Sequence, residues 1–164
     1  MPFVMAAINE RIVHRSNQLL GTMYGKDFKY DEAMSSKTAS TAWITTLGLG
    51  AFVGAASFAP VRNLLANHIL PKPGEGPSVD DQENGMFDMR FYAELNNGKR
   101  QVVQVTGDKD PGYGSTAKML SQAALCLAKD IPDVKGGFWT PASALGDALI
   151  HRLGKHAGVF IKEL

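Results

Sequence analysis

The sequence predicts an α+β fold with a mainly antiparallel sheet and helices gathered on one face. Residues 87–95 alternate between apolar and polar side chains, and Asn96-Asn97-Gly98-Lys99 joins this run to a second alternating run, residues 100–106. Such a pattern is typical of an antiparallel hairpin. Helical periodicity recurs before and after the hairpin. A chain of 164 residues builds one core of ordinary size, so we expect a single domain over residues 1–164.

The first element expected is an amphipathic helix over residues 4–20, ended by Gly21. Its predicted core stripe is Met5, Ile8, Ile12, Ser16 and Leu19. A weaker alternation over residues 27–34, with Phe28 and Tyr30 on one side, predicts a short strand.

Thr38 to Val61 contains no charged residue and is long enough to cross a membrane. Its threonines, serines and the glycines Gly48, Gly50 and Gly54 dilute the apolar content below that of a leucine-rich span. Three interpretations stay open: a buried or interfacial helix packed through small residues, a membrane-touching surface, and a true span.

The remaining elements follow from local signals. We expect a helix over residues 61–70 that Pro71 ends, and then a long connection without hydrophobic period through Asn84. Residues 115–129 are expected to be helical, Thr140-Pro141 to begin the next helix, and residues 158–164 to form a closing strand. The predicted core stripe of the first of these helices is Ala117, Leu120, Ala124 and Leu127, and that of the second is Leu145, Leu149 and Leu153.

Composition excludes several classes of function. The formal net charge is +1, so the chain has no field that would draw it to nucleic acid. The single cysteine, Cys126, forms no internal disulfide and is expected to pack as a small hydrophobe, which favours the cytoplasm. No metal site is predicted, because the four histidines are not spaced as metal ligands, apart from the five-residue separation of His151 and His156, and no acidic residue completes a ligand set. We interpret the histidines as solvated or helix-end residues. These are His14, His68, His151 and His156.

A glycine-rich turn precedes the helix that begins near Ser115. Gly112, Gly114 and Ala117 match the G-x-G-x-x-A spacing of a dinucleotide turn. The context argues against that function, because such a turn follows its strand directly in a parallel unit, whereas this one follows half of a hairpin. The glycines can instead make a sharp turn with Ser115 or Thr116 as helix cap. Alternatively, free backbone donors beside Tyr113 and Lys118 could hold an anionic group of a substrate.

Two further surfaces could meet a substrate. Asn9, Arg11, Arg15 and Ser16 give the first helix a polar side that is either simply solvated or able to bind an acidic group. Trp139 precedes the helix start at Thr140 and is either a core plug or one wall of a pocket.

The chain resembles the saccharopine dehydrogenase-like oxidoreductases, in particular the bacterial branch called trans-acting enoyl reductases. The resemblance spans nearly the whole chain but only the carboxyl-terminal part of that family's length. The segments that carry it are Pro2-Phe3-Val4-Met5-Ala6 with Asn9 and Arg15-Ser16, Tyr24 to Phe28, Pro71 to Ser78, Gly107 to Met119, Ala123 to Ala128 and Gly136 to Ala142.

The resemblance implies a substrate-side and dimerisation domain, with the family's amino-terminal Rossmann domain absent. NAD(P) is expected in the full-length family enzyme and no cofactor in this chain, which alone should not transfer hydride. The expected partners are a small-molecule or acyl substrate, a second subunit in a homodimer, and lipid through residues 38–61, with the protein cytoplasmic or peripheral to a membrane. The residues expected to bind substrate are Asn9, Arg15, Ser16, Tyr113, Ser115, Thr116, Lys118, Trp139 and Thr140. No catalytic residue is assigned.

Two other functions are compatible with the same sequence. The chain could be a free-standing lipid- or acyl-binding or membrane-associated interaction module. It could also be an inert remnant that folds without acting.

Overall fold

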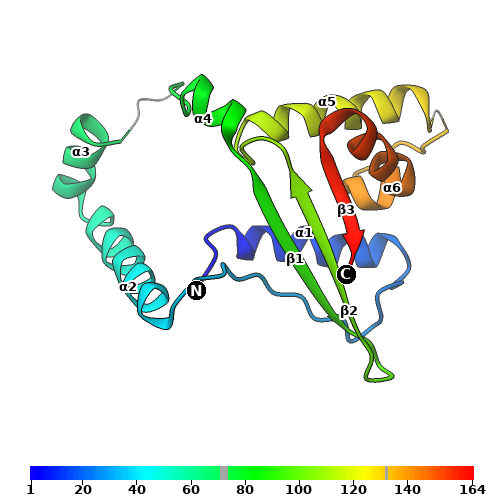
Figure 1. Cartoon of the computed structure of the whole chain (residues 1–164), viewed down its shortest axis with the longest axis horizontal. Coiled ribbons are helices and arrows are strands. Elements are labelled where there is room, and N and C mark those ends of the chain that lie inside the picture. The colour runs from blue at the N-terminus through cyan, green and yellow to red at the C-terminus, as the bar shows by residue number, and fades with distance from the viewer. Residues whose placement is uncertain (71–73, 132) are drawn as a thin grey trace. The chain divides into compact units, whose positions relative to one another are not determined.

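The computed structural model describes residues 1–70, 74–131 and 133–164. The chain divides into two compact units, Met1–Glu75 and Gly76–Leu164. Among the described residues there are six α-helices, a short π-helix and one three-stranded antiparallel sheet (Figure 1). This composition confirms the α+β class, while the single-domain organisation stays a prediction.

Helix α1, Ala6–Leu19, lies inside the predicted range. Its predicted core stripe is wrong at Ile8 and Ile12, which are both at least half exposed, and right at Ser16, which is buried. Asn17, outside the predicted stripe, is also buried. Asn17 is buried because its side chain organises the following turn. Its amide nitrogen donates to the Gly25 carbonyl at 2.9 Å, and its amide oxygen accepts from the Tyr24 backbone at 2.8 Å.

Residues 27–34, all described, form no strand, so that prediction is wrong. The only regular pairing there is an isolated bridge between Pro2 and Ala33. The alternation reflects a ring cluster instead, in which Phe28 contacts Tyr24, Tyr30 and His14 with ring centroids 5.4 to 6.4 Å apart.

Helix α2, Ala39–Ala56, begins at Thr38, whose hydroxyl accepts the Thr41 backbone N–H at 3.2 Å. None of its residues is buried in the described chain, so the first of the three open interpretations, a helix tightly packed through small residues, is not seen there. Helix α3, Ala59–His68, has Pro60 in its first turn, where proline needs no backbone donor, and contacts α2. It ends before Pro71, which lies outside the described residues together with Lys72 and Pro73.

The predicted connection through Asn84 contains a short helix that sequence periodicity did not reveal. Helix α4, Val79–Asn84, begins at Ser78, whose hydroxyl accepts the Asp81 backbone N–H at 3.1 Å. This helix has only six residues, with acidic side chains in its first turn and no apolar stripe. Its start is therefore stabilised by the cap and by the acidic residues near the positive end of the helix dipole, not by burial.

The hairpin prediction is confirmed. Strands β1, Phe87–Glu94, and β2, Arg100–Gly107, pair antiparallel, and β3, Val159–Glu163, pairs with the other edge of β2. The turn between β1 and β2 has Gly98 at φ 77°, a conformation that glycine adopts without strain. Along β1 only Phe87 and Phe91 are half-buried and the other positions are exposed.

Helix α5, Gly114–Lys129, contacts α6, Pro141–Arg152, and the π-helix η1, Leu153–Ala157. The predicted core stripe of α5 is wrong, because Leu120 and Leu127 are at least half exposed. Its buried positions are Ser115 and Cys126, so the burial of Cys126 is confirmed. The predicted start of α6 is also confirmed, and Leu145 is buried while Leu149 and Leu153 are partly so.

Candidate functional site

The turn between β2 and α5 is organised by the carboxylate of Asp110. This carboxylate accepts the backbone N–H groups of Gly112, Tyr113 and Gly114 at 2.9, 2.7 and 2.9 Å. The hydrogen bonds from Gly114, Tyr113 and Gly112 hold the pKa of Asp110 below its usual value. The first donors of α5 are therefore satisfied from within the chain.

The predicted caps and free donors of this turn need correction. Helix α5 begins one residue earlier than expected, and neither Ser115 nor Thr116 caps it. The Ser115 hydroxyl is buried and donates to the Lys109 carbonyl at 3.2 Å, while that of Thr116 donates to the Pro111 carbonyl at 2.7 Å. The donors expected to hold a substrate anion are occupied by Asp110.

The same geometry decides whether the glycine spacing fits a coenzyme. A diphosphate at this turn would have to displace an ionised carboxylate from the backbone N–H groups that it needs. A Cβ placed on Gly114 would lie 2.7 Å from the Gln82 carbonyl oxygen, so the glycine permits close approach of α4 rather than of a ligand. The turn does not fit a dinucleotide.

The charged side chains around this turn are paired with each other. The Lys118 ammonium donates to both carboxylate oxygens of Asp108, at 2.6 and 2.8 Å. Lys109 pairs with Glu83 just after the middle of α4. Tyr113 is about half exposed, and a Cβ on Gly76 would lie 3.6 Å from its ring. In this turn Tyr113 therefore offers the most accessible surface among the predicted substrate residues.

Trp139 and Thr140 lie at the start of α6. The Trp139 indole donates to the Lys135 carbonyl at 2.8 Å, and its side chain remains 43% exposed, so it is not a core plug. Thr140 forms a capping box with Ser143, in which each side chain bonds the other residue's backbone N–H. Thr140 thus has a structural role, whereas the exposed ring of Trp139 can meet a ligand.

In the first unit, the predicted polar side of α1 is partly engaged. The Asn9 amide donates to Glu32 at 2.9 Å, and the buried Ser16 hydroxyl donates to the Ile12 carbonyl at 2.8 Å. Arg15 is exposed. Substrate contact by the nine predicted residues stays a prediction.

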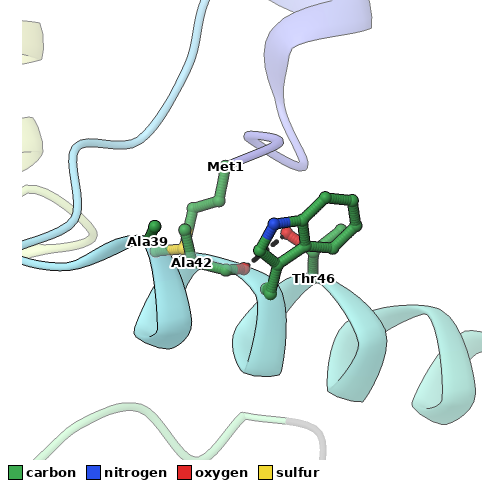
Figure 2. Close-up of a pocket in the computed structure, with 5 residues that line it drawn as sticks. Met1, Ala39, Ala42 and Thr46 are labelled. Carbon is green, nitrogen blue, oxygen red and sulfur yellow. Dashed lines mark hydrogen bonds between the residues drawn. The ribbon is translucent and has the colours of Figure 1, made fainter.

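Two pockets lie away from the predicted residues. One, of about 280 Å³, is lined by Met1 and the first two turns of α2. Figure 2 shows Met1 beside Ala39 and Ala42, with Thr46 one turn further along. The Thr46 hydroxyl donates to the Ala42 carbonyl at 2.7 Å, which leaves this pocket an apolar lining.

The second pocket, of about 330 Å³, lies where α6 continues into η1. The sequence analysis interpreted His151 and His156 as solvated or helix-end residues and predicted no pocket there. The available signal was the spacing of His151, Arg152, Lys155 and His156, which places four basic side chains within six positions. All four histidines of the chain are exposed, as expected. Among described residues, no group of three potential metal ligands occurs.

Comparison with known proteins gives trans-acting enoyl reductases among the relatives of this chain. The chain is 39% identical over 161 residues to a Mycobacterium tuberculosis (strain ATCC 25618 / H37Rv) protein provisionally named a trans-acting enoyl reductase. It is 36% identical to a trans-acting enoyl reductase of Mycobacterium ulcerans and 37% identical to one of Mycobacterium bovis, each over 160 residues. Every alignment covers 92% of this chain but only 38% of the relative. No family model and no solved structure matches the chain.

Proposed function

We propose that this chain is the substrate-side part of an NAD(P)H-dependent enoyl reductase, corresponding to the carboxyl-terminal domain of a saccharopine dehydrogenase-like oxidoreductase. The observation that carries the proposal is the 36–39% identity to trans-acting enoyl reductases over 92% of the chain. The chain spans about 38% of the length of these relatives, and we assign the coenzyme to residues outside this matched region.

The β2–α5 turn supports placing the coenzyme on another part of the enzyme. The backbone N–H groups at its dinucleotide-like glycine spacing are occupied by the Asp110 carboxylate, and its two lysines are paired with acidic side chains. A hydride donor must be held in contact with its acceptor, so a second part would supply the coenzyme while this chain positions the substrate. The exposed ring of Trp139 and the Tyr113 side chain are the groups we propose to contact a small-molecule or acyl substrate, in a homodimer.

A chimaeric enzyme tests this proposal. This chain would replace the matching 161 residues of the Mycobacterium tuberculosis relative, and NADPH oxidation would be followed with an enoyl thioester. We expect activity from the chimaera, none from the chain alone, and a raised KM in the chimaera carrying Trp139→Ala. Trp43→Ala, which changes the exposed tryptophan on α2, is the matched control. A folded but inactive chimaera of an active parent, or saturable NADPH binding by the isolated chain, would contradict the proposal.

A second candidate function, a lipid- or acyl-binding, membrane-associated module, is favoured by α2. This 18-residue helix has a mean hydropathy of 1.3 and none of it is buried in the described chain. By length and composition α2 can cross a membrane, and it is the one such helix among the described residues. An uncharged helix that is apolar on all sides is normally covered by protein or lipid. The protein would then be peripheral to a membrane or anchored in one.

Vesicle flotation distinguishes this candidate. We expect the chain to float with phosphatidylcholine vesicles, and the Leu47→Lys variant to float far less, because a lysine at a helix centre costs about 2.5–3.5 kcal/mol in a membrane. Val79→Lys is the matched control, since Val79 is also exposed but lies on the acidic helix α4. Equal flotation of the wild type and the Leu47 variant, or no flotation, would contradict membrane association through α2.

A further inference from the structure

The pocket at the junction of α6 and η1 concentrates positive charge. Four of its six lining residues are basic and one is acidic. The lining residues are Asp130, Ala148, His151, Arg152, Lys155 and His156. Three of the basic residues, His151, Lys155 and His156, are exposed, and none of them forms an ion pair with another described residue. The pocket therefore presents one ammonium group and two imidazoles toward solvent.

Arg152 is held in one orientation by groups on α5 and at its end. Its Nε and Nη2 donate to the two carboxylate oxygens of Asp130, the second at 3.0 Å, and its Nη1 donates to Gln122 at 3.2 Å. Each terminal nitrogen of a guanidinium carries two hydrogens, so one N–H on each remains for another acceptor. The side chain is a preorganised donor whose own charge is balanced by Asp130.

Beyond this pair, Lys155 carries the remaining formal charge of the lining, and His151 and His156 add two imidazole rings. Basic side chains at a helix end also complement the helix dipole, which amounts to about half an elementary charge. Lys155 alone matches that charge, so the two imidazoles are available to the pocket as hydrogen-bonding groups. His151 and Arg152 end α6, Lys155 and His156 lie in the π-helical turn at residues 153–157, and all four line one pocket. Such turns frequently occur at functional sites.

We propose that this pocket binds a phosphate group, with Lys155 as the charged partner, the His156 imidazole as a hydrogen-bond donor, and the free N–H groups of Arg152 as oriented donors. A volume of about 330 Å³ accommodates such a group with water. Acyl groups presented as thioesters are carried on a pantetheine arm that ends in a phosphate. The assignment of the ligand to that arm rests on the proposed function, whereas the phosphate site itself does not.

Isothermal titration calorimetry of the full chain in low-salt buffer tests the site, with inorganic pyrophosphate as the probe. We expect saturable binding that weakens at least tenfold in the double variant Lys155→Gln, His156→Gln. Lys162→Gln, which removes an exposed lysine of β3, should bind as the wild type does. Circular dichroism verifies folding of each variant. Absent saturable binding, or equal binding by the double variant, overturns the proposal.

Two further ligands test whether the bound phosphate belongs to a pantetheine arm or is a free phosphate. Coenzyme A should bind more tightly than pyrophosphate, and pantetheine without phosphate should not bind. If coenzyme A binds no more tightly than pyrophosphate, the pantetheine assignment is wrong while the phosphate site stands. An inactive chimaera with intact pyrophosphate binding would contradict the proposed function alone.

Discussion

Replacing Gly158 with alanine tests how the sheet is joined to the helices of the second unit. Gly158 follows η1 at φ 66°, a conformation that costs an alanine about 1 kcal/mol or slightly more. A Cβ there would lie 2.2 Å from a carboxylate oxygen of Asp108. Because that carboxylate is the far end of a flexible side chain, it should move away and lose its ion pair with Lys118. Exposed pairs of this kind contribute about 0.2–1 kcal/mol.

The two contributions together predict a loss of about 1.2–2 kcal/mol in the free energy of unfolding. Urea denaturation followed by circular dichroism measures it. Gly98→Ala is the matched control, because Gly98 has φ 77° but nothing within 4 Å of its Cβ position, so only the backbone cost applies. In a double-mutant cycle, Lys118→Met should matter less in the Gly158→Ala background. Equal losses for both glycine variants and full additivity in the cycle would refute this reasoning.

Three further outcomes are expected. Thr140→Ala removes the capping box of α6 and should destabilise the second unit by about 1 kcal/mol, measured by urea denaturation. Thr116→Ala is the control, because Thr116 caps no helix. Burial raises the pKa of Cys126, so a maleimide should label it only on unfolding, and labelling of the native chain at the free-thiol rate would contradict its burial. Burial, and after it a 2.8 Å hydrogen bond to Glu32, raises the pKa of Tyr30. The contribution of Tyr30 to the free energy of unfolding should therefore be complete below about pH 10 and decrease at higher pH. In alkaline denaturation, the stability of the Tyr30→Phe variant should decrease less steeply with pH than that of the wild type.

The parts of the fold that sequence predicts are those set by neighbouring residues. The hairpin follows from alternation and a turn containing Gly98, and the start of α6 follows from a threonine, a proline and Ser143 within four positions. Both signals are complete within a few residues, so no knowledge of tertiary packing was needed.

The errors occur where tertiary contacts decide. In α5 periodicity selected the face that contains Leu120, whereas packing buries the face that contains Ser115 and Cys126. In α1 the buried Asn17 binds the turn at Gly25, a contact that hydrophobic patterning does not include. For α2, apolar composition is the same whether a protein layer or lipid covers the helix, so sequence left both open.

The turn before α5 shows what sequence spacing leaves open about electrostatics, while the predicted substrate contacts stay untested. Sequence spacing identified the glycine turn as an anion-binding position but did not show which anion fills it. Asp110 lies four residues before Gly114, and the turn folds its carboxylate back onto the backbone donors, so the chain supplies its own anion. Because Lys109 and Lys118 are also paired, little positive charge remains at this turn. The exposed surplus lies instead at the π-helical end of α6, and an anionic ligand of this unit should therefore be sought at Lys155 and His156 rather than at the glycines.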